Sequence, residues 1–318
     1  MMLSNTMFKK SESVSGRIKI WVDTIKKISL SKKLPKNFRK LKAFVNIVEG
    51  THKYSAYCNF YYLQSVFFKN SMNKFNYQKI YPGPNSVTIN NFKTNPTILR
   101  YIRNAHNIEL LFSKKIFKSS IYEIGAGYGG DCKILNDLSI IRNKQKIKRY
   151  YIFDLSKKNL LLIKLFLKKF NYNFKVAKFN NKIGNNDLLI SNAALSEMNG
   201  KTLFKYINFL KKFKKGFLIT NFDTNSEPYG GISLKEFLKI IKNKNPEVLA
   251  SYKFNTLWDW RFGSKDSSKI VVFGHKKIDV KFSFLREIKI LIKYFFCEKF
   301  LLIDIINFLI RSLYKKSF

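Results

Sequence analysis

The chain has 318 residues, 46% of them hydrophobic, so it is long and apolar enough to fold around a sizeable core. It carries 60 Lys and Arg against 20 Asp and Glu, a formal net charge of +40. Its three cysteines lie far apart, which excludes a disulfide framework and a cysteine-based zinc site.

The positive charge favours anionic partners, but nearly all of it comes from lysine, because only nine of the basic residues are Arg. Arg makes bidentate contacts with phosphate, whereas dispersed Lys is typical of a solvated surface and of AT-rich codon usage. An anionic membrane surface or a phosphate-bearing substrate therefore ranks above nucleic acid as a partner. The first twenty residues show no secretion signal, and we expect a cytoplasmic protein, with the inner face of the membrane as the alternative.

Residues 1–118 are expected to form a helical region over the substrate. Apolar residues recur at spacings of three and four near 17–30, 38–49, 54–70 and 97–113. Between these stretches, the sequence Tyr81-Pro-Gly-Pro-Asn85 predicts a turn.

Residues 119–276 alternate short apolar runs with amphipathic stretches, which is typical of β-α units around a mostly parallel sheet. Strands are predicted near 120–124, 149–154, 174–179, 187–191, 216–221, 247–253 and 269–274. Helices are predicted at 130–142, 157–170, 199–212 and 233–244. The last two strands have no helix between them and should pair as a hairpin. The predicted fold class is therefore α/β, with a Rossmann-like sheet of seven strands.

The tail, residues 277–318, is predicted to be an amphipathic helical segment. Charged residues interrupt it repeatedly, and no window reaches the roughly 18 uncharged apolar residues that a spanning helix needs. Two surroundings are possible for its apolar face. The face lies in a lipid interface, or it packs on the domain or on a second subunit of a homo-oligomer. Packing is the more frequent outcome.

A glycine loop follows the first predicted strand directly, in the segment Ile121-Tyr-Glu-Ile-Gly-Ala-Gly-Tyr-Gly-Gly-Asp131. Glycines allow the backbone to turn sharply and to approach a ligand closely. The N–H groups at the following helix start can receive a carboxylate. The residues predicted to bind a cofactor here are Gly125, Ala126, Gly127, Tyr128 and Gly129.

The glycines of this loop also satisfy G-x-G-x-x-G, the motif of dinucleotide-binding sites. Two acids distinguish the loop from such a site. Glu123 precedes the first glycine by two residues and suits a cationic group, not a pyrophosphate. Asp154 ends the second strand, later than the roughly 20 residues typical of the dinucleotide fold, and can accept both ribose hydroxyls. Asn180, after the third strand, can read an adenine edge. The pattern predicts S-adenosyl-L-methionine as cofactor.

A second motif, Asp187-Leu-Leu-Ile-Ser-Asn-Ala-Ala-Leu-Ser-Glu-Met198, ends the fourth strand. Together with the glycine loop, its Ser191-Asn192 and Ser196-Glu197 resemble the paired signatures of a family of sugar O-methyltransferases. The resemblance extends upstream through Gly83-Pro-Asn85 and Thr97-Ile-Leu-Arg-Tyr101 and covers about residues 80–275. Ala193-Ala194 is smaller than the aromatic expected at that place.

The resemblance implies a class I methyltransferase that methylates a sugar hydroxyl in bacterial surface-polysaccharide biosynthesis, on a free, nucleotide-linked or lipid-linked saccharide. It places Ser191 and Asn192 beside the cofactor. A base near the hydroxyl would help by roughly 100- to 10,000-fold. Glu197 is the first candidate, with helix capping as its alternative role, and Asp223 and His275 follow.

Tyr229 and Trp258 are predicted to stack against a sugar face, with core packing as the alternative for Trp258. No His, Asp and Glu cluster has ligand spacing, so no required metal is expected. Ser191-Asn-Ala-Ala194 lacks the proline and aromatic that grip a flipped base, which disfavours a nucleobase amine. Two other functions stay open: an RNA methyltransferase that uses the lysine surface, and a noncatalytic binding protein with this fold.

Overall fold

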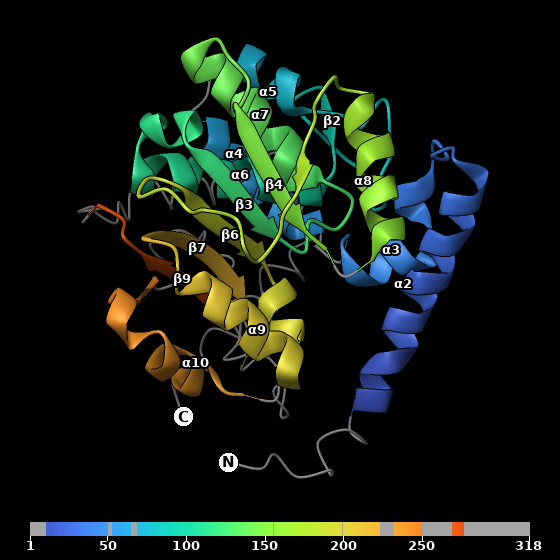
Figure 1. Ribbon diagram of the computed structural model, residues 1–318. Coiled ribbons are helices and arrows are strands. Elements are labelled where there is room, and N and C mark those ends of the chain that lie inside the picture. Colours follow the sequence, from blue (N-terminus) through green and yellow to red (C-terminus); the bar gives the residue numbers. More distant parts are fainter. Residues whose placement is uncertain are drawn as a thin grey trace, which may run out of the picture.

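The computed structural model describes residues 11–49, 53–64, 69–154, 156–198, 200–222, 232–249 and 269–276. Its centre is a seven-stranded sheet with the order β5-β4-β3-β6-β7-β9-β8 (Figure 1). The strands are β3 Ser120–Ile124, β4 Arg149–Phe153, β5 Lys175–Val176, β6 Leu188–Asn192, β7 Lys215–Thr220, β8 Glu247–Leu249 and β9 Lys269–Phe273.

Strands β5, β4, β3, β6 and β7 run parallel, while β9 pairs antiparallel with both β7 and β8. The predicted Rossmann-like sheet that closes with an antiparallel hairpin is therefore confirmed. Strand β5 is shorter than predicted, because it lies at the edge of the sheet with both side chains exposed.

Helices cover both faces of this sheet (Figure 1). On one face, the hydrophobic core includes side chains of α6 Pro96–Phe112, α7 Gly130–Asn143 and α8 Lys157–Lys168. On the other face, a second core includes side chains of α9 Gly200–Leu210 and α10 Leu234–Ile240. This arrangement leaves the carboxyl ends of the parallel strands as the edge where loops meet, which is where α/β sheets bind ligands.

The N-terminal region is mostly helical, as predicted, but its first helix is longer than predicted and the stretch predicted over 38–49 is divided. Its elements are α2 Ser11–Ser31, η1 Phe38–Lys40, α3 Lys42–Ile47, α4 Lys53–Gln64 and α5 Lys69–Phe75. The single helix predicted over 38–49 is divided because Leu41 is extended, with ψ 142°. A further 3-10 helix, η2 Lys114–Lys118, connects α6 to the sheet.

A small hairpin, β1 Val87–Ile89 and β2 Phe92–Thr94, was not predicted. Each of its strands alternates buried and exposed side chains, and Asn90-Asn91 takes positive φ angles in the turn between them. Asparagine tolerates this conformation, so the alternating residues around Asn-Asn were a readable hairpin signal.

The N-terminal helices and the sheet share one continuous hydrophobic core. Phe38 lies edge-on to both Tyr128 of the glycine loop and Phe166 of α8. The boundary at residue 118 and the separate tail remain predictions, and residues 277–318 lie outside the described part of the chain. Among the helices described, none is long and apolar enough to cross a membrane.

Candidate active site at the glycine loop

The glycine loop connects the carboxyl end of β3 to α7 in a backbone conformation that favours glycine. Gly125, Gly127 and Gly129 have φ angles of 71°, 58° and 96°, in the left-handed region where a Cβ is strained. The Gly125 N–H donates to the carbonyl of Phe153 at 2.9 Å, and the Gly129 N–H donates to that of Ala126 at 2.7 Å. The predicted loop therefore lies between the ends of β3 and β4 and opens into the N-terminus of α7.

The small pair Ala193-Ala194 faces this loop. A Cβ built on Gly125 would lie 2.1 Å from the Cβ of Ala194, so neither position has room for a larger side chain. Ala193 has φ 66° and donates its N–H to the carbonyl of Ile219 at 2.8 Å. The aromatic expected here is absent because the turn after β6 packs directly on the glycine loop.

Glu123 is buried beneath the loop, with 1% of its surface exposed. It accepts a hydrogen bond from the Tyr150 hydroxyl at 2.7 Å. Burial raises the pKa of its carboxyl well above the ordinary value, and the carboxylates of Asp131 and Asp154 raise it further. The negative charges of Asp131 and Asp154 therefore both act on Glu123 beneath this loop.

Asp131, in the first turn of α7, is a site residue that the sequence reasoning missed. It is buried and accepts a hydrogen bond from Asn192 Nδ2 at 3.1 Å, which joins the start of α7 to the end of β6. Burial raises its pKa to about 6, although Asn192 and Arg100 oppose this shift. Its position directly after the glycine loop was the available signal.

Asp154 lies after β4, as predicted, and a second missed residue holds it. Asn159 Nδ2 donates to Asp154 Oδ2 at 2.6 Å and to the Gly127 carbonyl at 3.0 Å. Asn159 is itself buried near the start of α8. One amide therefore sets the distance between the acid and the loop.

Arg100 of α6 brings a cation to the same region. Its Nη2 donates to the Val48 carbonyl at 3.0 Å, and its charge acts on Asp131. Its buried Nε has no hydrogen-bond partner among the described residues. The positive charge of Arg100 therefore lies close to the first turn of α7.

Three other residues predicted for the site differ in burial: one is buried within the sheet and two are exposed outside it. Ser191 is buried, donates to the Ile124 carbonyl at 3.3 Å and accepts from the Leu195 N–H at 3.3 Å, so it ties β6 to β3. Asn180 is exposed in the loop after β5. Glu197 is exposed at the end of η3 Ala194–Glu197, the turn that follows β6.

His275 lies at the opposite edge of the sheet. Because β9 runs antiparallel to β7 and its last residue, Phe273, pairs with Gly216, His275 lies near the amino ends of the parallel strands. There it hydrogen-bonds Glu247 Oε2 at 3.0 Å. This position argues against a role as base beside the glycine loop.

Three predicted residues, Asp223, Tyr229 and Trp258, lie outside the described part of the chain. Across the residues that the structure does describe, no three His, Cys, Asp or Glu side chains are grouped so that they could hold a metal ion.

The strand order, the antiparallel seventh strand and the glycine loop define the Rossmann-like fold of class I methyltransferases. A comparison with solved structures finds only low similarity. A candidate S-adenosyl-L-methionine-dependent methyltransferase from Methanococcus maripaludis is 14% identical over 57% of this chain and 87% of its own, with a TM-score of 0.39.

An O-methyltransferase family protein from Burkholderia thailandensis is 10% identical over 56% of this chain and 57% of its own, with a TM-score of 0.37. The N-terminal domain of EvdMO1, solved in the presence of SAH and D-fucose, is 14% identical over 66% of this chain and 97% of its own, with a TM-score of 0.37. No family model matches the sequence, and no curated protein matches it.

Proposed function

We propose that the protein is an S-adenosyl-L-methionine-dependent methyltransferase that acts on a hydroxyl group of a saccharide. The main evidence for this cofactor is that three acids, Glu123, Asp131 and Asp154, gather at the glycine loop. They do so in a chain whose net charge is +40. The repulsion of Glu123 by Asp131 and Asp154 is relieved by a bound cation and made worse by a pyrophosphate. A sulfonium nucleoside fits this field, and a nicotinamide dinucleotide does not.

The residues around the loop match the parts of that cofactor. Asp154, oriented by Asn159, presents carboxylate oxygens that can accept ribose hydroxyls. Asp131 supplies negative charge for the ammonium and sulfonium groups, and a bound cation would favour ionisation of Glu123 beneath it. The N-terminus of α7 and Arg100 suit the methionine carboxylate. When bound, the cofactor supplies an electrophilic methyl group.

The saccharide acceptor rests on the resemblance carried by the motif at the end of β6. Transfer to oxygen depends mainly on holding the hydroxyl in line with the methyl group. We propose Glu197 as proton acceptor, because it is exposed on the turn after β6, and Asp223 as the second candidate. Lysines on the surface would help to recruit a nucleotide-linked or lipid-linked sugar and an anionic membrane face, and we propose a cytoplasmic location.

The test combines cofactor binding with methyl transfer. Calorimetry on the folded protein should detect S-adenosylmethionine and its demethylated product, but not NAD. With radiolabelled cofactor and separate saccharide-precursor, RNA and protein extracts, label should enter the saccharide fraction alone, and Gly127→Arg should abolish it. Glu197→Gln should lower the rate and leave cofactor affinity unchanged.

Each alternative has its own outcome. Label in RNA would replace the saccharide acceptor with an RNA acceptor. Cofactor binding without label in any fraction would indicate a noncatalytic binding protein. Failure to bind the cofactor, or binding of NAD instead, would overturn the proposal as a whole.

A further inference from the structure

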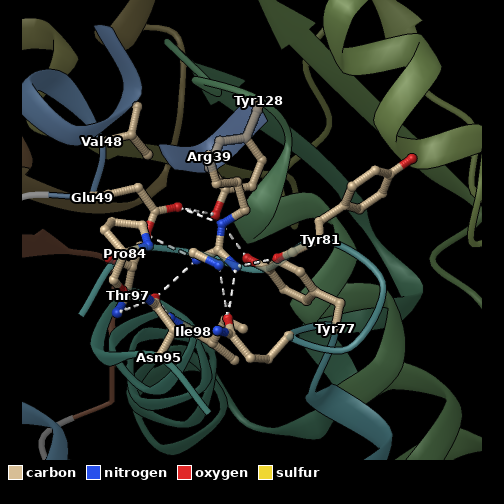
Figure 2. Close-up of polar contacts among 12 residues, drawn as sticks. Arg39, Val48, Glu49, Tyr77, Tyr81, Pro84, Asn95, Thr97, Ile98 and Tyr128 are labelled. Carbon is tan, nitrogen blue, oxygen red and sulfur yellow. Dashed lines mark hydrogen bonds and ion pairs between the residues drawn. The ribbon is translucent and has the colours of Figure 1, made fainter. Parts of the chain in front are cut away.

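A buried ion pair in the N-terminal region lies behind the glycine loop (Figure 2). Arg39 of η1 is fully buried and donates Nε to Glu49 Oε1 at 2.5 Å and Nη2 to Glu49 Oε2 at 2.8 Å. The same guanidinium also donates to the Tyr81 carbonyl at 2.9 Å and to Asn95 Oδ1 at 2.8 Å. A bidentate pair with these additional bonds fixes the carboxylate of Glu49.

The carboxylate of Glu49 in turn binds Tyr128, the central residue of the glycine loop. The Tyr128 hydroxyl donates to Glu49 Oε1 at 3.0 Å and lies 2.9 Å from the Tyr77 hydroxyl. Because a phenol has one proton, Tyr77 donates to Tyr128, and Tyr128 donates to Glu49. The side chain of Tyr128, predicted to contact the cofactor, is therefore buried and bonded to the N-terminal region.

The backbone around this ion pair also approaches the loop. A Cβ built on Gly127 would lie 3.5 Å from Val48 Cγ2, so Val48 packs on the loop directly. The neighbouring turn is shaped by the ion pair, because a Cβ on Gly83 would lie 2.8 Å from Cζ of Arg39. This close approach gives a structural reason for glycine in the Gly83-Pro-Asn85 motif.

We propose that Arg39, Glu49 and Tyr128 are positioning residues that set cofactor affinity, so that residues 38–49 act as part of the cofactor site. This inference rests on the proposed function. Tyr128 stands between Gly127 and Gly129, two residues with little conformational restriction of their own. Without its anchor, ordering the loop would oppose binding, and we expect a loss of affinity of about 5- to 30-fold.

Two hydroxyl deletions on the same hydrogen-bond chain test this. Tyr128→Phe removes both the bond to Glu49 and the bond from Tyr77, whereas Tyr77→Phe removes only the bond from Tyr77 and leaves Tyr128 bonded to Glu49. Calorimetry with S-adenosylhomocysteine, well below each Tm, should show an affinity about 5- to 30-fold weaker for Tyr128→Phe and within about 2-fold of wild type for Tyr77→Phe. Tyr128→Phe should also lose more thermal stability than Tyr77→Phe, because it removes two buried hydrogen bonds and Tyr77→Phe removes one.

Glu49→Gln provides the second variant, made alone and in the Tyr128→Phe background. It should weaken binding when Tyr128 is present and have less effect when the hydroxyl is already missing. If wild type binds and Tyr128→Phe binds equally well with a lower Tm, the ion pair is structural only and the inference is overturned. If wild type itself does not bind the cofactor, the proposed function fails first.

Discussion

The side-chain amide of Asn192 donates to the carboxylate of Asp131 at 3.1 Å, which links the end of β6 to the first turn of α7. Burial raises the pKa of that carboxyl to about 6. The folded state therefore holds the Asp131 proton more tightly than the unfolded state does. Stability from this group is present below about pH 4 and is lost as the pH rises through about 6.

We expect Asp131→Asn to raise the free energy of unfolding at pH 7 by on the order of 1–2 kcal/mol, because the amide avoids the cost of a buried charge. At pH 4 the variant and wild type should be equally stable, since Asp131 is then protonated. Urea denaturation across pH 4–7 gives the comparison. Parallel curves for the two proteins over this range would show that Asp131 does not titrate as described.

The same acid should control the pH dependence of cofactor binding. A cationic cofactor requires an ionised Asp131, so affinity for S-adenosylmethionine should rise as the pH increases from 5 to 7 and level off above that range. The steepest slope available from one proton is about tenfold per pH unit. Asp131→Asn should bind more weakly and lose this slope. A pH-independent affinity in wild type would remove Asp131 from the binding site.

Asn159 donates both to Asp154 and to the Gly127 carbonyl, so removing the Asn159 amide should weaken the cofactor site through the loss of both hydrogen bonds. We expect Asp154→Asn to weaken binding of S-adenosylhomocysteine by about 10- to 100-fold, because two hydrogen bonds to an ionised acceptor are weakened. Asn159→Ala should weaken it by a similar factor, although Asn159 is placed to contact Asp154 and not the ribose. Calorimetry on both variants, with circular dichroism to verify folding, measures this. An unchanged affinity in Asn159→Ala would mean that Asp154 needs no orientation.

Because Gly125 lies so close to Ala194, adding a single methyl group at Gly125 should strongly destabilise the fold. Gly125→Ala should lower the free energy of unfolding by about 2–4 kcal/mol, because the new Cβ meets Ala194 at a positive φ angle. Adding Ala194→Gly should restore only part of this loss, since it relieves the contact and not the backbone strain. Thermal and urea unfolding of both variants decide this. Full recovery in the double variant would show that φ strain contributes nothing.

His275 provides a negative prediction. It bonds Glu247 near the amino ends of the parallel strands, at the edge of the sheet opposite the glycine loop. His275→Ala should leave the rate of methyl transfer and its pH profile within about 2-fold of wild type, because a general base must reach the proton that it removes. A loss of about 100-fold or more, with stability retained, would place His275 in the site after all.

The elements that depend on local chemistry could be predicted from the amino-acid sequence alone. The alternation of apolar runs and amphipathic stretches predicted the seven strands in order, and the glycines from Gly125 to Gly130 predicted a sharp turn after the first strand. Asp154 was placed correctly after β4 because a residue that follows a parallel strand lies at the ligand-binding edge. These features depend on neighbours within a few residues, so a pattern in the chain suffices to reveal them.

Contacts between residues far apart in the chain could not be predicted in this way, because they depend on how the elements pack. Asn192 reaches Asp131 and Glu49 reaches Tyr128 because separate elements pack together, and no local pattern records such pairings. The direction of β9 likewise placed His275 away from the loop, since reversing a strand exchanges the two edges of the sheet. The buried Arg39 has no signature in the sequence, because its burial depends on partners 10 to 56 residues away. Long-range packing thus determined how the N-terminal region contacts the glycine loop.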